Sequence, residues 1–215
     1  MTATESLTSR EIAEARLAVY GFLHRALDKP TPAQHAWMQQ PQFSEALGLV
    51  CNRFDLPVPE EIMPTAYADF ESRYIACFEV GLPAPPVPLQ ASCYNRREPV
   101  PAVIHEHVLF YKRFGLTRFE DNHESADHVL NELAFLLHLD ELLLAHPKTL
   151  NSILLARRDF LTRHLARWLP QAAADAEDKH LPALYRTLFT LLASAVNQDL
   201  QLTGAFLDQQ TTEDP

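Results

Sequence analysis

The residues best suited to do chemistry lie together in the sequence Glu-Ser-Ala-Asp-His at residues 124–128. It runs directly into the apolar stretch at residues 129–133, which predicts that Asp127 and His128 lie in the first turn of a helix capped by Ser125. A carboxylate at that position is stabilised by free backbone N–H groups and by the helix dipole. Asp127 and His128 could therefore anchor the helix, or they could offer an acceptor and a donor to a bound peptide. The residue types leave both interpretations open.

The ten histidines could instead hold a metal ion. His105 and His107 are two positions apart on a predicted helix, so they point to different sides and cannot share one ion. His128 and Glu132 are four positions apart and could chelate, but no third ligand accompanies them in the sequence. The one Glu-x-x-His pair, at residues 120–123, has no second copy to complete a di-iron site, and there is no His-Glu-x-x-His motif. The sequence therefore predicts no metal site and no cofactor.

Other catalytic signatures are missing as well. The cysteines Cys51, Cys77 and Cys93 form no Cys-x-x-Cys pair, and an odd number of them fits a reducing compartment better than a disulfide framework. The chain has no Gly-x-Ser-x-Gly motif, no phosphate-binding loop and no dinucleotide fingerprint. We therefore expect a protein that is not an enzyme.

Composition narrows the class of partner. The formal net charge is −10, which disfavours nucleic acid and favours a cationic partner. The N-terminal residues include charges and no apolar signal segment, and no apolar run reaches the ~20 residues that a membrane span needs. These features predict a soluble, cytoplasmic protein.

The elements that must position these residues are predicted to be helices. Leu and Ala dominate, and only five glycines occur among 215 residues. We expect an all-α fold of about eight to ten helices, a single domain over residues 1–215. Its N-terminal half (8–114) and C-terminal half (126–208) would meet at a connector near residues 115–125. Helices are predicted at residues 9–27, 33–39, 43–54, 60–78, 100–114, 125–146, 150–168 and 184–204.

The segment at residues 81–94 differs from the rest of the chain. It contains four prolines and no charge, yet Leu82, Val87 and Leu89 make it apolar. Because proline excludes both helix and central strand, we expect an extended loop. An apolar loop of this kind must either pack on the body of the protein or bind a partner.

Charge is segregated in the second half of the chain. Residues 119–147 hold seven acids and neither Lys nor Arg, whereas the following predicted helix is basic. Two neighbouring helices could pair their outer faces, or the acids could form a rim for a basic peptide. The sequence does not decide between them.

The order of four motifs resembles that of the TorD/DmsD/NarJ family of molybdoenzyme maturation chaperones. The motifs are the Pro-rich loop that ends in Ser-Cys-Tyr at residues 92–94, Tyr-Lys-Arg-Phe-Gly-Leu at 111–116, the Glu-Ser-Ala-Asp-His element, and Phe-Leu-x-x-His-Leu-x-x-Trp at 160–168. The resemblance spans about residues 10 to 205. Two positions depart from the family's usual pattern: Ala126 stands where proline is common, and Leu89 stands where an aromatic residue often occurs.

The resemblance implies a TorD-like helical globule that binds the apo catalytic subunit of a molybdenum oxidoreductase and its twin-arginine leader until the cofactor is inserted. The segment at residues 101–111 is more similar to the subgroup that serves type II enzymes of the dimethyl sulfoxide reductase superfamily. Such a leader is cationic and apolar, so acidic side chains beside the loop would suit it. The protein would be a monomer or a domain-swapped dimer hinged at the connector. The peptide-binding residues implied are Pro86, Leu89, Ser92, Tyr94, Gly115, Glu124, Asp127 and His128.

Two alternatives remain open. A helical adaptor or regulator would have the same fold without a preference for twin-arginine peptides. A His/Glu metal-binding protein would retain an ion through dialysis. Leader-peptide titration and metal analysis distinguish these alternatives from the chaperone.

Overall fold

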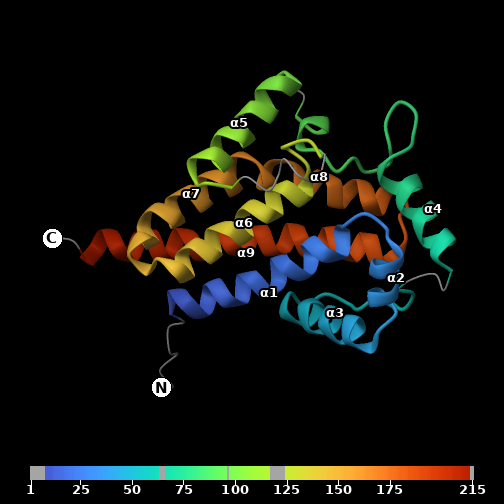
Figure 1. The fold of residues 1–215 in the computed structure, drawn as a ribbon, viewed down its shortest axis with the longest axis horizontal. Helices are drawn as coiled ribbons and strands as arrows, with labels where there is room; N and C mark the ends of the chain where they lie inside the picture. Colours follow the sequence, from blue (N-terminus) through green and yellow to red (C-terminus); the bar gives the residue numbers. More distant parts are fainter. Residues whose placement is uncertain (1–7, 63–65, 96, 117–123, 214–215) are drawn as a thin grey trace.

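The structure is a computed structural model that describes residues 8–62, 66–95, 97–116 and 124–213. Within these ranges the regular secondary structure is helical, apart from one isolated antiparallel bridge between Gln90 and His128, so the predicted all-α class is confirmed (Figure 1). The α-helices are α1 (Ser9–Leu27), α2 (Pro32–Met38), α3 (Pro41–Arg53), α4 (Tyr67–Phe78), α5 (Val100–Arg113), α6 (Val129–Ala145), α7 (Leu150–Arg163), α8 (Leu165–Asp178) and α9 (Ala183–Glu213), and η1 (Ala91–Cys93) and η3 (Pro147–Thr149) are short 3-10 helices.

Helix α6 lies at the centre of the molecule, as its apolar sequence predicts. Leu133, Leu136 and Leu139 have no exposed surface, and burial of each such side chain contributes about 2 kcal/mol. Helix α1 packs along α6, and α7 and α8 pack against α9. Figure 1 shows α2, α3 and α4 gathered at one end of this bundle, with α5 above it. On the side where α5 lies, its neighbours are α7 and α8 (Figure 1).

Several local predictions are confirmed by the helix ends. The Thr8 hydroxyl accepts from the Glu11 backbone N–H at 3.3 Å, and the Glu11 carboxylate accepts from the Thr8 N–H at 2.8 Å, which completes a capping box. Thr31 caps α2, whose first residue is Pro32. Gly115 follows α5 with φ = 74°, a conformation that glycine adopts without strain.

Two predicted helix starts are wrong. The helix expected from Glu60 begins only at Tyr67. An earlier start would place Pro64, which lies outside the described residues, inside the helix, where a backbone N–H is needed and proline has none. The central helix is capped by His128 instead of Ser125, so Asp127 and His128 precede its first turn. The Ser125 hydroxyl donates to the Asp127 carboxylate instead, and this contact removes it as a cap.

Two long helices were predicted after residue 147, and the described residues form three, α7, α8 and α9. Their apolar positions continue from Leu150 to Trp168, but the backbone breaks at His164 (φ −119°, ψ −93°), which separates α7 from α8. The spacing of apolar residues does not reveal such a break, because the same face stays buried on both sides of it. The last helix also continues past Gly204 to Glu213, because a single helical glycine costs only about 1 kcal/mol.

A closed set of four charges lies inside the bundle and joins α1, α6, α7 and α9. The Arg157 side chain is fully buried and contacts Asp140 at 3.0 Å and Asp199 at 2.7 Å. Arg16 contacts Asp199 at 2.6 Å and lies 4.0 Å from Asp140. Burial of each charge is costly unless it is neutralised nearby, and here two cations meet two anions.

The acids of residues 119–147 and the bases of the next helix were expected either to pair on outer faces or to leave an acidic rim. The described residues show a different arrangement. Asp140 of the acidic stretch does pair with Arg157 of the basic helix, but in the interior instead of on outer faces. Arg163 pairs with Glu106 on α5. Glu120 and Asp121, expected in an acidic rim, lie outside the described residues, as does most of the connector. The division into two halves therefore stays a prediction. Across the described ranges, no helix has the length and apolar character required to cross a lipid bilayer.

Candidate functional site

Asp127 fixes the end of the Pro-rich loop to the start of α6. Backbone bonds run from the Ala91 N–H to the Asp127 carbonyl at 2.9 Å and from the Val129 N–H to the Leu89 carbonyl at 2.8 Å. The Asp127 carboxylate also accepts from the Ser92 N–H at 2.9 Å. Burial alone would raise the pKa of Asp127, but its bonds from Ser125 and Ser92 lower it. This charged, 1% exposed side chain therefore holds the loop in place.

His128 is equally buried. Its ring accepts from the Leu130 N–H at 3.3 Å and lies 3.7 Å from the Glu124 carboxylate, which itself pairs with Lys29. Burial lowers the pKa of His128, so the ring is neutral near pH 7. Asp127 and His128 are engaged inside the fold, and they do not form the surface donor and acceptor pair that the sequence suggested.

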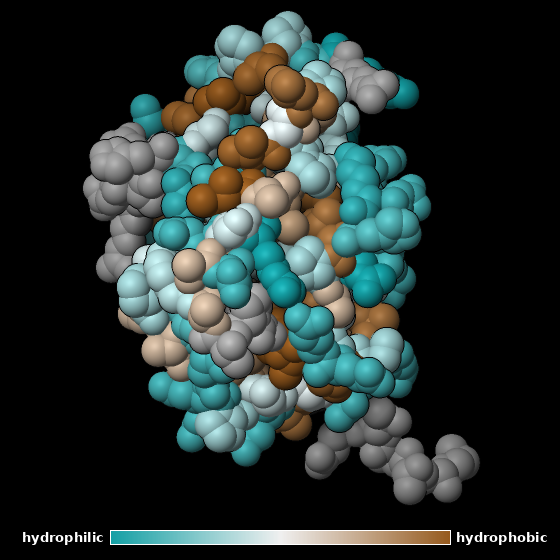
Figure 2. Space-filling view, turned by 90° about the vertical axis from the view of Figure 1, so that its right-hand side faces the viewer, coloured by the Kyte–Doolittle hydropathy of each residue, from teal (hydrophilic) through white to brown (hydrophobic). Residues whose placement is uncertain are grey.

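The Pro-rich loop packs on the body along part of its length. Val87 and Leu89 are buried, whereas Leu82 is fully exposed. The Tyr94 hydroxyl donates to the Pro88 carbonyl at 3.1 Å. Figure 2 looks at the end of the molecule that carries α4 and this loop, and apolar atoms gather in its upper half. The expectation that the loop packs on the body is confirmed for Val87 and Leu89, and partner binding by its exposed part stays a prediction.

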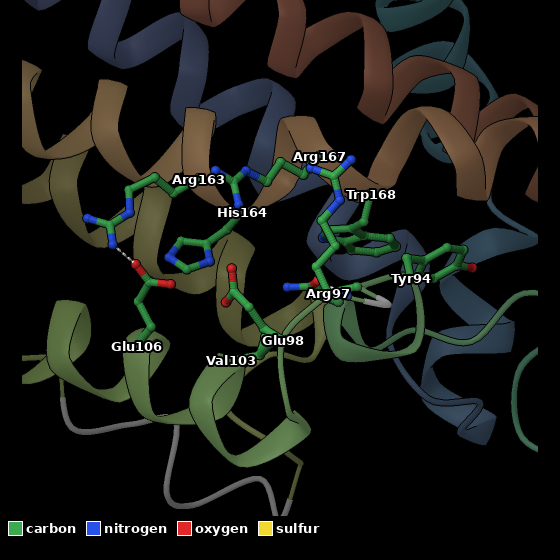
Figure 3. Close-up of a pocket in the computed structure, with 11 residues that line it drawn as sticks. Tyr94, Arg97, Glu98, Val103, Glu106, Arg163, His164, Arg167 and Trp168 are labelled. Atoms are coloured by element: carbon green, nitrogen blue, oxygen red, sulfur yellow. Dashed lines mark hydrogen bonds and ion pairs between the residues drawn. The ribbon is translucent and has the colours of Figure 1, made fainter.

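A cavity of about 700 Å³ opens beside the end of this loop. One wall comes from the segment after η1 and from α5, and the other comes from α7 and α8 around their break (Figure 3). The Tyr94 and Trp168 rings stack at 5.2 Å between centroids. The lining residues are Ala91, Tyr94, Asn95, Arg97, Glu98, Val103, Glu106, Arg163, His164, Arg167 and Trp168.

The charges of this cleft are mixed, with an excess of arginine. Arg97, Arg163 and Arg167 line it together with Glu98 and Glu106, and Arg163 is already paired with Glu106. The described side chains therefore do not form the acidic groove that was expected beside the loop. They suit a segment that carries carboxylates together with apolar side chains.

A second hollow of about 620 Å³ shares Tyr94 with the first. Pro83, Pro85 and Pro88 of the loop line it, and Asp175 and Lys179 of the α8 end lie opposite. Lys179 ties the two sides together, because its ammonium group donates to the Pro86 carbonyl at 2.6 Å. Tyr94 thus stands at the boundary between a hollow walled on one side by prolines and an arginine-rich cleft.

A buried polar cluster lies behind the cleft. The His107 ring approaches Glu132 at 3.0 Å, and the Trp168 indole N–H donates to the other oxygen of Glu132 at 3.0 Å. His164 lies against His107, with 3.9 Å between ring centroids. Burial raises the pKa of Glu132, and Glu132 raises the pKa of His107 against the opposing effect of burial. Each member of the His107–Glu132 pair therefore keeps its proton to a higher pH than it would in water.

The sequence-predicted residues lie in four different places. Leu89, Ser92 and Asp127 meet where the loop joins α6, and Glu124 and His128 lie beside them. Tyr94 lines both hollows, while Gly115 only ends α5. The backbone of Pro86 accepts from Lys179.

Sequence reasoning missed the arginines of the cleft and the cluster of His107, Glu132 and His164. Arg163 and Arg167 were seen only as part of a basic helix. One signal for the site was present, because His164 and Trp168 belong to the motif at residues 160–168 that supported the family resemblance.

Comparisons with known proteins bear on this site. A family described as nitrate reductase delta subunit matches residues 33–174. The perchlorate reductase assembly chaperone protein of Dechloromonas aromatica (strain RCB) is 29% identical over 199 residues, which cover 87% of this chain and 89% of the relative. The dimethyl sulfide dehydrogenase assembly chaperone protein of Rhodovulum sulfidophilum is 28% identical over 187 residues, 82% of this chain and 73% of the relative.

A shorter match is the selenate reductase assembly chaperone protein of Thauera selenatis, 33% identical over 104 residues that cover 47% of this chain and about half (54%) of the relative. No solved structure matches the chain significantly. Each of these relatives is described as an assembly chaperone, which agrees with the expectation that the chain is not an enzyme.

Proposed function

This chain belongs to the nitrate reductase delta subunit family, and we propose that it is an assembly chaperone that holds the apo catalytic subunit of a molybdenum oxidoreductase. Family membership agrees with the resemblance carried by the sequence motifs. The relatives named for perchlorate, selenate and dimethyl sulfide enzymes support a client of the type II dimethyl sulfoxide reductase class. The chaperone would act in the cytoplasm, before the client is exported.

The observation that carries the proposal is the cleft beside Tyr94. Its stacked Tyr94 and Trp168 rings offer a large, rigid aromatic surface to an apolar side chain. Arg97 and Arg167 can bind carboxylates of the same segment through paired N–H donors. We place an extended segment of the catalytic subunit in this cleft.

For the twin-arginine leader we propose the second hollow. The prolines of its wall are apolar, and Asp175 supplies a half-buried carboxylate at its edge, which a leader arginine would share with Lys179 at 3.3 Å. The formal net charge of −10 also favours a cationic leader. The arginines of the first cleft disfavour the leader there. Leader and mature segment would then meet at Tyr94.

The eight residues named from the sequence acquire distinct roles in this proposal. Tyr94 contacts the client directly, and the Pro86 and Leu89 region shapes the hollow. Asp127, His128 and Ser92 position the loop. Glu124 supports His128 and pairs with Lys29, and Gly115 ends α5.

A titration of the purified chain with fluorescent peptides tests the proposal. One peptide is the leader and the other is an acidic, aromatic segment of the mature subunit, both from the molybdenum enzyme encoded nearest to this chain's gene. We expect both to bind and Tyr94→Ala to weaken both by about tenfold, because removal of a central aromatic contact costs about 1–2 kcal/mol. Arg167→Glu should weaken only the mature segment, with a loss that shrinks as salt is added.

The matched control is Arg158→Glu, which makes the same charge change at an exposed position of α7 outside the cleft. It should leave both affinities within about twofold. If neither peptide nor the apo subunit binds better than a scrambled peptide, the chain is a helical adaptor of another kind.

A further inference from the structure

Three buried metal-ligating side chains converge behind the cleft, each from a different element. They are His107 on α5, Glu132 on α6 and His164 at the break between α7 and α8. One ligand atom from each lies within 4.8 Å of the others. His107 and Glu132 have no exposed surface, and His164 is 4% exposed.

Each of the first two ligands is held by a further hydrogen bond. The other ring nitrogen of His107, Nδ1, lies 2.8 Å from the Val103 carbonyl, so it donates there and directs Nε2 at Glu132. The Trp168 N–H occupies Glu132 Oε2 and leaves Oε1 facing His107. Support of this kind, from a backbone carbonyl and an indole, is what orients the ligands in metal sites.

The third ligand provides an independent observation. Within the described residues, His164 Nε2 is buried and has no hydrogen-bond partner. A buried polar atom left in that state costs about 1–3 kcal/mol. Seven other buried side-chain atoms among the described residues share it, but only His164 belongs to a group of three metal-ligating side chains. His164 also lines the cleft, and Figure 3 shows its ring directed from the α7–α8 wall into the cavity.

We propose that His107, Glu132 and His164 bind one divalent transition-metal ion of the zinc type, with its fourth position open toward the cleft. Two nitrogens and one carboxylate oxygen are a donor set that zinc accepts, and three protein ligands leave one position for water or a client side chain. Ligands about 2.0 Å from a tetrahedral ion lie roughly 3.3 Å apart. Small side-chain rotations would therefore close the site from its present spacing.

Charge and proton balance are compatible with such an ion. Both groups bind a metal ion in their deprotonated forms, so any proton they hold leaves to solvent on binding. The two positive charges of the ion then face the carboxylates of Glu132 and of nearby Asp127, whose field reaches His107. The charges of Arg163 and Arg167 act at His164 in the opposite sense. The bound ion would tie α5 to the α7–α8 break, and these are the two walls of the cleft.

Metal binding by the full-length chain, with any affinity tag removed, tests the site. After treatment with chelator, we expect one Zn²⁺ per chain by elemental analysis and calorimetry, and visible absorption bands of a four-coordinate site with Co²⁺. Added Zn²⁺ should raise the melting temperature of the protein, and Mg²⁺ should not.

Glu132→Gln is the decisive variant, because an amide can still accept from Trp168 and donate to His107 Nε2, which keeps the fold. It should lower Zn²⁺ affinity by at least about 100-fold, as should His164→Gln. The control is His105→Gln, an exposed histidine two residues from His107 on the same helix, which should bind like the unchanged chain. Absence of a stoichiometric ion overturns the proposal, and so does Zn²⁺ binding that survives Glu132→Gln or is lost with His105→Gln.

Discussion

Two buried polar clusters among the described residues differ in whether their charges balance one another. In the bundle core, Arg16, Asp140, Arg157 and Asp199 form a set of two cations and two anions, although Arg16 Nε and Asp140 Oδ1 have no hydrogen-bond partner there. Behind the cleft, His107, Glu132 and His164 lie equally deep, and His164 Nε2 has neither a hydrogen bond nor an ion pair among the described residues. The first cluster stabilises the bundle, and the second is the one for which we propose a metal ion.

The two clusters also border cavities of different size. The charge set joins four helices in the interior, and Arg16 and Asp199 line a cavity of about 160 Å³. The histidine cluster borders a cavity of about 700 Å³, so its environment can change when the cavity fills. Substitutions should therefore affect chiefly stability in the first region, and ligand or pH responses in the second.

The largest effect is expected from Arg157→Ala. It leaves Asp140 and Asp199 buried with only Arg16 to neutralise them, which should lower the free energy of unfolding by about 3–5 kcal/mol. Urea unfolding followed by circular dichroism measures this loss. Arg158→Ala, an exposed neighbour, should change it by less than about 0.5 kcal/mol. A loss below 1 kcal/mol for Arg157→Ala would mean that the charge set is not closed to water.

A smaller effect is expected from Asp127→Ala, which acts where the loop meets α6. It removes bonds from the Ser92 N–H and the Ser125 hydroxyl to a charged acceptor, at a cost of about 1.5–3 kcal/mol. The Ser92 amide should also exchange its hydrogen faster, which mass spectrometry detects. Asp127→Asn keeps an acceptor and should show a smaller change. Unchanged exchange at Ser92 would show that Asp127 does not hold the loop.

The third prediction sharpens the comparison through pH. Burial, with help from the charges of His107, Arg163 and Arg167, lowers the pKa of His164 from 6.5 to about 2. As the pH falls below 6.5, the unfolded chain takes up a proton at this residue and the folded chain does not. The contribution of neutral His164 to the free energy of unfolding is therefore complete above pH 6.5 and is lost as the pH falls toward 2. Between pH 7 and 5 this loss is about 2 kcal/mol.

His164→Asn should abolish that part of the pH dependence. Urea unfolding at pH 7 and pH 5, in chelator, should show the unchanged chain losing about 2 kcal/mol more than the variant. Asp140, whose pKa burial raises to about 6, titrates in both chains and cancels in the comparison. Equal losses in the two chains would show that His164 can be protonated in the folded state.

Most of the fold could be predicted because its determinants are local. The capping box at Thr8, the proline that opens α2 and the glycine after α5 each act within a few residues, and the structure has all of them. The break at His164 was missed because it interrupts the backbone without changing which face is apolar. Family membership was predictable from motif order, although each motif alone is loose.

The site could be predicted only in outline. Tyr94 was named because the family resemblance implied it, and Asp127 because it precedes an apolar run. For Asp127 and His128 the sequence left open whether they anchor the helix or contact a peptide, because a sequence does not reveal that both are covered by the loop they organise. The histidine cluster joins positions 25 and 32 residues apart on three elements, a separation that no helical spacing rule connects.

The charge set of the bundle core also bears on how the chain folds as it is made. Arg16 and Thr203 are hydrogen-bonded across 187 positions, and Asp199 neutralises both arginines. Until residue 199 has left the ribosome, Arg16 and Arg157 face Asp140 alone, two positive charges against one negative charge. Because such an excess opposes burial, the early helices cannot complete their core during synthesis. This chain would therefore become fully folded only when its last helix is nearly complete.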